Sequence, residues 1–166
     1  MDFTRRTFIR LLSTLPLLSY APRLLARPSL RDFRTTLVAF LDTLMPADDT
    51  PAASDLGVPD KLMSLADSDR RYERLLLNGC LWLDNMALKR HDYEFHALDE
   101  WQRVAIVERL ETSQAPRFAR VFMRRVLADL YEFYYSQPRS WPGLGIERPP
   151  QPLGYRDYAK PPASKT

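Results

Sequence analysis

The chain has 166 residues, of which 27% are charged, a composition typical of one folded domain. The net charge of +3 comes from residues 1–27, which hold five arginines and one aspartate, whereas the rest of the chain holds 19 basic and 20 acidic side chains. A folded body without excess positive charge argues against nucleic acid as a partner.

The N-terminal residues resemble an export signal. The order Ser/Thr-Arg-Arg-x-Phe-Leu/Ile-Lys/Arg, typical of twin-arginine signals, is filled by Thr4, Arg5, Arg6, Phe8, Ile9 and Arg10. The uncharged stretch LLSTLPLLSYAP follows, and as a helix it would reach about 18 Å, too short for a hydrocarbon core of about 30 Å. We expect residues 1–27 to be a twin-arginine signal peptide, read by the Tat translocase, and the protein to reach the periplasm. The alternative is a basic amphipathic helix that lies on the body or on a membrane surface.

Start and stop signals predict a helical domain over residues 28–137. Ser29 and Asp32 have the spacing of a capping box and open a helix that Pro46 ends. After a loop rich in Pro, Asp and Ser, Pro59 suits the first position of a short helix. The predicted helices span residues 29–45, 59–66, 69–89, 99–111 and 117–136.

The long helices have apolar faces, and no segment alternates with the period of a strand. Leu37, Leu41 and Leu44 fall on one stripe of the first helix. Two further faces are formed by Tyr72, Leu76, Cys80, Leu83 and Met86, and by Phe118, Phe122, Val126, Leu130 and Phe133. The pattern predicts an all-α fold, a small bundle of about four main helices, in which the single cysteine is a buried structural thiol.

Motifs for catalysis or cofactor binding are incomplete. Residues 143–148 (GLGIER) begin like a dinucleotide-binding loop but lack its third glycine and a preceding strand. A single cysteine cannot form a C-x-x-C-H haem site, and no E-x-x-H repeat of a di-iron bundle occurs. His91 and His96 are five residues apart, a spacing that does not place two side chains on one helix face. The adjacent Asp48 and Asp49 point in different directions, so they make a poor acid–base pair. We therefore predict no catalytic residue, metal site or cofactor in this chain.

The C-terminal residues 138–166 differ in composition from the helical domain. They contain seven of the 14 prolines, so we predict an extended arm. The arm also carries spaced aromatic and apolar side chains, which disordered tails usually lack. The predicted anchors for a partner are Trp141, Leu153, Tyr155 and Tyr158. The arm lies either on the chain's own bundle or on a partner protein.

Several segments occur in a family-like order. They are residues 40–58 (FLDTLMPADDTPAASDLGV), 95–111 (FHALDEWQRVAIVERLE), 133–138 (FYYSQP), Trp141 and 153–155 (LGY). Together they resemble subunit 3, the small subunit, of gluconate 2-dehydrogenase and its relatives. Two departures, Ala52 where the family has glycine and the proline-rich arm in place of a glycine-rich turn, leave the subfamily open.

This resemblance implies a non-catalytic partner of a large FAD-dependent dehydrogenase of the glucose-methanol-choline type. In several relatives the small subunit carries the only twin-arginine signal, and a membrane-anchored multihaem cytochrome c often accepts the electrons. FAD is then expected in the large subunit and haem c in a third subunit, with gluconate, a sugar or a polyol as the substrate. The alternative is a self-sufficient exported helical protein, metal-binding or enzymatic, that uses His91, His96 and the carboxylates near them.

Overall fold

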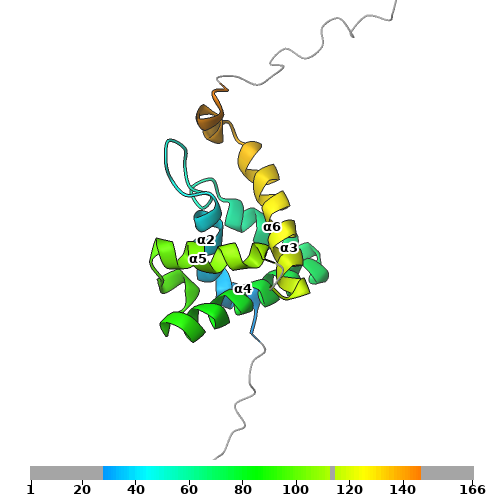
Figure 1. Cartoon of the computed structure of the whole chain (residues 1–166). Helices are drawn as coiled ribbons and strands as arrows, with labels where there is room; N and C mark the ends of the chain where they lie inside the picture. The colour runs from blue at the N-terminus through cyan, green and yellow to red at the C-terminus, as the bar shows by residue number, and fades with distance from the viewer. Residues whose placement is uncertain (1–27, 113–114, 147–166) are drawn as a thin grey trace, which may run out of the picture.

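A computed structural model describes residues 28–112 and 115–146, and all regular elements of this part are helical. The α-helices are α2 (Arg34–Leu44), α3 (Val58–Ser68), α4 (Arg70–His91), α5 (Glu100–Glu111) and α6 (Arg117–Tyr135). Short 3-10 turns are η1 (Leu30–Phe33), η2 (Phe95–Ala97), η3 (Pro138–Ser140) and η4 (Pro142–Leu144). The predicted all-α fold is confirmed, and α2 and α3, with 11 residues each, are the shortest of the α-helices described (Figure 1).

Three helical elements, η1, α4 and α5, begin where capping side chains satisfy free backbone N–H groups. The N–H of Ser29 donates to the Asp32 carboxylate over 2.8 Å, and the chain then enters η1 before it becomes α2. The Asp69 carboxylate accepts from the N–H of Arg71 over 2.7 Å at the start of α4. At α5, Asp99 and Gln102 form the predicted capping box. Local spacing along the chain therefore sets these three helix starts, whereas α3 and α6 follow Gly57 and Pro116 without a side-chain cap.

The core is centred where α4 and α6 cross. Gly79 of α4 lies directly against the ring of Phe122 of α6, so close that a Cβ at this position would overlap the ring. Phe122 stacks on Phe40 of α2, with ring centres 5.2 Å apart, and Phe40 meets Phe95 edge-on at 6.5 Å. Phe40 is fully buried although it was not on the predicted stripe. Its position three residues after Leu37 is the signal that could have placed it there.

The predicted faces of α4 and α6 are largely buried, with one exception. Tyr72, Leu76 and Cys80 lie in the core as predicted. Phe118 was predicted on the apolar face of α6, but its side chain is 44% exposed, so this part of the prediction is wrong. It lies in the first turn of α6 and lines an open groove beside Trp82 instead of entering the core.

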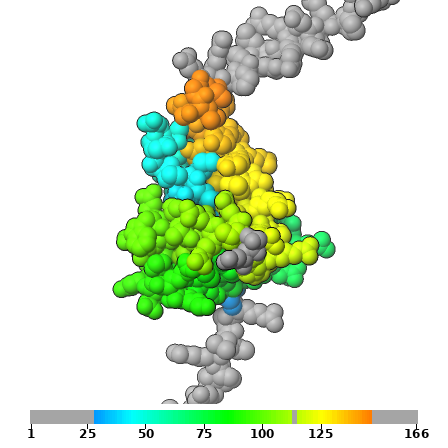
Figure 2. Space-filling view, viewed as in Figure 1, coloured from blue at the N-terminus to red at the C-terminus, as the bar shows by residue number. Residues whose placement is uncertain are grey.

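One end of the molecule is formed by a loop and the end of α6. In Figure 1 the loop between α2 and α3 and the turns η3 and η4 lie at the same end as the last turns of α6. Figure 2 shows the orange turns at this end of the molecule, above the cyan loop. Residues 138–146 of the predicted arm are therefore folded into turns and are not extended. The other arm residues, 147–166, lie outside the described part of the chain.

Candidate functional site

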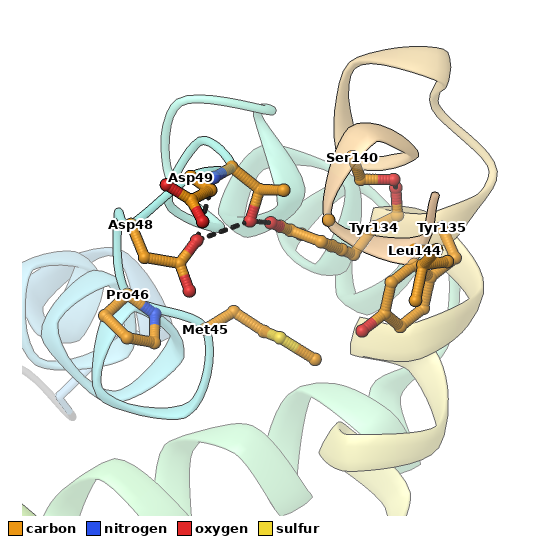
Figure 3. Close-up of a pocket in the computed structure, with 10 residues that line it drawn as sticks. Met45, Pro46, Asp48, Asp49, Tyr134, Tyr135, Ser140 and Leu144 are labelled. Carbon is orange, nitrogen blue, oxygen red and sulfur yellow. Dashed lines mark hydrogen bonds between the residues drawn. The ribbon is translucent and has the colours of Figure 1, made fainter. Parts of the chain in front are cut away.

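The junction between the α2–α3 loop, the end of α6 and the turn η3 brings together segments that are distant in sequence. We call it the loop junction. Residues 45–50 of the loop face residues 134–144 across a small open pocket of about 230 Å³ (Figure 3). Two of the segments with the family-like motifs, 40–58 and 133–138, therefore meet here.

The first part of the motif fixes the loop to its own helix. The Asp42 carboxylate of α2 accepts a 2.8 Å hydrogen bond from the N–H of Ser54, which lies on the far side of the loop. The next residue, Thr43, accepts a 3.2 Å bond from Arg103 Nε of α5. Asp42 and Thr43 thus each join α2 to a different part of the fold.

Tyr134 holds the loop from the side of α6. Its buried hydroxyl donates to the Pro51 carbonyl over 2.7 Å and lies 3.0 Å from Thr50 Oγ1. The Thr50 hydroxyl donates in turn to Asp48 Oδ1 over 2.8 Å, and the N–H of Thr50 donates to the same oxygen (Figure 3). These bonds lower the pKa of Asp48. The exposed Asp48 carboxylate thus stabilises a turn, as expected for this sequence.

The residues after Tyr134 close the junction. Gln137 Nε2 donates to the Leu56 carbonyl over 2.9 Å, which ties the end of α6 to the end of the loop. The Ser140 hydroxyl lies 2.8 Å from the Gln137 carbonyl and 3.0 Å from that of Tyr134. With backbone carbonyls as its partners, Ser140 is held as a structural donor and is not activated by a base.

Trp141 is the one predicted partner anchor that falls within the described residues. Its indole N–H donates to the Tyr135 carbonyl over 2.9 Å, and its ring is partly exposed beside the last turn of α6. The export-signal residues and the other three anchors lie outside the described part, namely Arg5, Arg6, Phe8, Ile9, Leu153, Tyr155 and Tyr158.

Two buried carboxylates, which the sequence patterns did not single out, join elements inside the body. Asp84 of α4 accepts from the Thr36 hydroxyl at 3.0 Å and from the N–H of Phe95 at 3.1 Å. Burial raises the pKa of Asp84, an effect that these hydrogen bonds oppose. Asp129 of α6 is bonded to Arg125 Nε at 2.9 Å. Both carboxylates have structural partners and lie apart from the loop junction.

Other titratable groups have equally local surroundings. Cys80 is fully buried, and burial raises the pKa of its thiol, which agrees with the predicted structural role. His91 Nδ1 lies 3.2 Å from Gln102 Nε2, and His96 Nδ1 lies 3.5 Å from the Glu94 carboxylate. Among the described residues, no three potential metal ligands come together.

The chain was compared with models of known protein families, and one of them matches most of the described residues. The model described as gluconate 2-dehydrogenase subunit 3 matches residues 32–142, which include every α-helix described above and the loop junction up to Pro142. The chain belongs to this family. Comparison with curated proteins and with solved structures gave no match.

The family match allows a structural interpretation of the loop junction. The motif residues are largely used to connect α2, the loop and α6 through hydrogen bonds within the chain. Within the described ranges, none of the helices combines the length and the hydrophobicity that a membrane-spanning helix requires. The family description names a subunit of a dehydrogenase, so this chain is related to components of a larger assembly.

Proposed function

We propose that this protein is the non-catalytic small subunit of a periplasmic FAD-dependent dehydrogenase complex of the glucose-methanol-choline type. It supports the export and maturation of the large flavoprotein subunit, which oxidises gluconate, a sugar or a polyol. FAD belongs to that large subunit. A membrane-anchored multihaem cytochrome c is the proposed electron acceptor.

The observation that carries the proposal is the family match over residues 32–142. The loop junction supports a structural role, because Asp42, Tyr134 and Ser140 are bonded to backbone groups of this chain and form no nucleophile–base pair with one another. A family match to a dehydrogenase subunit, in a chain with this site chemistry, favours a partner that contains the catalytic centre.

The N-terminal sequence supports the export role. Arg5 and Arg6 stand in a twin-arginine pattern, and the Tat pathway carries proteins that have folded before transport. A flavoprotein that binds FAD in the cytoplasm needs such a pathway. A small subunit bound to it would supply the signal for both proteins.

The export role is tested by replacing Arg5 and Arg6 with lysine in cells that also produce the large flavoprotein subunit. We expect both proteins to stay in the cytoplasm, as measured by fractionation and by dehydrogenase activity in the periplasm. Arg10→Lys, which leaves the arginine pair intact, is the matched control. Periplasmic flavoprotein in the double variant would show that it does not depend on this chain for export.

A truncation tests the proposed contribution of Leu153, Tyr155 and Tyr158 to partner binding. Because residues 138–146 belong to the folded body, the cut is placed after Ile146. We expect an unchanged helical spectrum and weaker association with the flavoprotein. Equal association of the truncated and full chains would remove this role from residues 147–166.

A further inference from the structure

The outer sides of α4 and α6 form a surface that is separate from the loop junction. An open groove of about 470 Å³ is lined by Asn78, Leu81, Trp82, Asn85 and Phe118. Val121, one turn after Phe118 on α6, is 46% exposed. Large apolar side chains that remain exposed beside a recess are typical of protein–protein contact sites.

The two helices that form this surface are rich in exposed arginine. Apart from Arg90 near the end of α4 and Arg125, which is paired with Asp129, the exposed arginines on these two helices are Arg70, Arg71, Arg74, Arg117, Arg120 and Arg124. None of the six forms an ion pair with another described residue. The carboxylates of Asp84 and Asp129 on these helices are buried, so the remaining acidic side chains of the two helices are Glu73, in the first turn of α4, and Glu132, near the end of α6.

Spacing places several of these charges beside the groove. Arg74 precedes Asn78 by one turn on α4, and Arg117 is directly before Phe118 on α6. Arg117, Val121 and Arg124 follow one another at helical spacing on one side of α6. Arg120, two residues after Phe118, lies on another side of α6. We call the groove residues, Val121 and the other five arginines the arginine face.

We infer that the arginine face binds a folded protein partner through an apolar side chain surrounded by carboxylates, and that this partner is the flavoprotein subunit. The inference rests on the proposed function. Arginine suits such a contact, because its planar guanidinium donates two parallel hydrogen bonds to one carboxylate. The apolar side chain of the partner would enter the groove between Trp82 and Phe118, and the arginines would select an acidic rim.

Charge excludes the other occupants that the chain itself offers. A second copy would bring arginines against arginines, which costs binding energy. Residues 147–166 hold four basic and two acidic side chains, and residues 1–27 hold five basic and one acidic. Both ends of the chain therefore carry the same sign as the arginine face.

Shape favours a protein over an anionic bilayer. A flat lipid surface would contact the arginines but would leave the recess beside Phe118 unfilled. The side-chain amides of Asn78 and Asn85 also need fixed hydrogen-bond partners once the groove is covered. A folded protein supplies both the filling side chain and the partners.

The test uses the full-length chain and the purified large flavoprotein subunit, with binding measured by titration at two salt concentrations. The variant Arg117→Glu/Arg124→Glu should raise the Kd by about tenfold or more, with a smaller salt dependence than the wild type. Phe118→Ser should also weaken binding several-fold. The matched control, Arg31→Glu/Arg90→Glu, reverses two exposed charges elsewhere and should stay within about twofold of the wild type.

The outcomes separate this inference from the proposed function. If the wild-type chain does not bind the flavoprotein, the proposed function is wrong and the inference falls with it. If the wild type binds but the two charge-reversal variants are indistinguishable, only the arginine face is wrong. Circular dichroism must show equal helicity in all variants. Sedimentation with phosphatidylglycerol vesicles is the last arm, and a loss of vesicle binding with intact flavoprotein binding would assign the face to a membrane.

Discussion

The two ends of α6 differ in whether their polar side chains are bonded within the chain. At the C-terminal end, Tyr134 and Gln137 are bonded to the α2–α3 loop. At the N-terminal end, Arg117, Arg120 and Arg124 are exposed without an ion pair among the described residues. Side chains at the first end stabilise the fold, whereas those at the second remain available for another molecule.

Both ends of α6 depend on the same packing contact, the crossing of α4 and α6 at Gly79. Gly79→Ala should therefore damage both, because the added Cβ would overlap the Phe122 ring, which is fully buried and stacked on Phe40. Overpacking of this kind costs up to about 3 kcal/mol, and the better helix propensity of alanine returns about 1 kcal/mol. We expect a net loss of about 2 kcal/mol in the free energy of unfolding, measured by urea denaturation.

Asn78→Ala, at the neighbouring exposed position, is the control for Gly79→Ala and should change stability little. If both variants unfold at the same urea concentration as the wild type, the close packing of α4 on α6 is wrong.

The loop junction is tested by Tyr134→Phe. Loss of the hydroxyl leaves the Pro51 carbonyl without its partner, which should lower the free energy of unfolding by about 1 to 2 kcal/mol. Tyr131→Phe removes a hydroxyl from an exposed tyrosine three residues earlier and should have almost no effect. Equal stabilities of the two variants in thermal denaturation would contradict a supporting role for Tyr134.

Asp84 tests whether a polar group inside the body behaves like those of the loop junction. Its pKa is raised in the folded state by burial, so the folded chain holds this proton more tightly than the unfolded chain does. The stability that protonation provides is complete below the unfolded value near 3.8 and is lost as the pH rises through the higher folded value.

The variant Asp84→Asn has an amide that does not ionise. This amide keeps an oxygen that can accept hydrogen bonds from Thr36 and Phe95. The stability of the variant relative to the wild type should therefore increase as the pH rises above about 4 and through the folded pKa of Asp84. Urea denaturation across this range measures the difference, and Asp67→Asn at an exposed site is the control. Parallel pH profiles of Asp84→Asn and the wild type would contradict the burial effect.

The smallest effect on stability is expected at the arginine face. Arg117→Ala/Arg124→Ala should change the free energy of unfolding by no more than about 0.5 kcal/mol, because both side chains are exposed and outside the ion pairs of the described structure. A loss above about 2 kcal/mol in urea denaturation would show that these arginines hold the fold together. It would also end the contrast between the two ends of α6.

The sequence by itself determined the helices, because the signals for a helix lie within four residues of one another. Ser29 with Asp32, and Asp99 with Gln102, predicted two helix starts that the structure confirms. The spacing of Leu76, Cys80 and Leu83 predicted the buried side of α4. The family also follows from the order of the motifs, which the match over residues 32–142 confirms.

Only the tertiary structure decided which distant groups meet. Tyr134 reaches Pro51 across 83 positions, and Asp84 reaches Thr36 across 48, distances along the chain that no local pattern encodes. Periodicity also cannot tell where a neighbouring helix stops covering a face, which is why Phe118 was predicted buried and is exposed. Proline content predicted an extended chain after residue 137, whereas hydrogen bonds from Ser140 and Trp141 to the end of α6 fold residues 138–146 into turns.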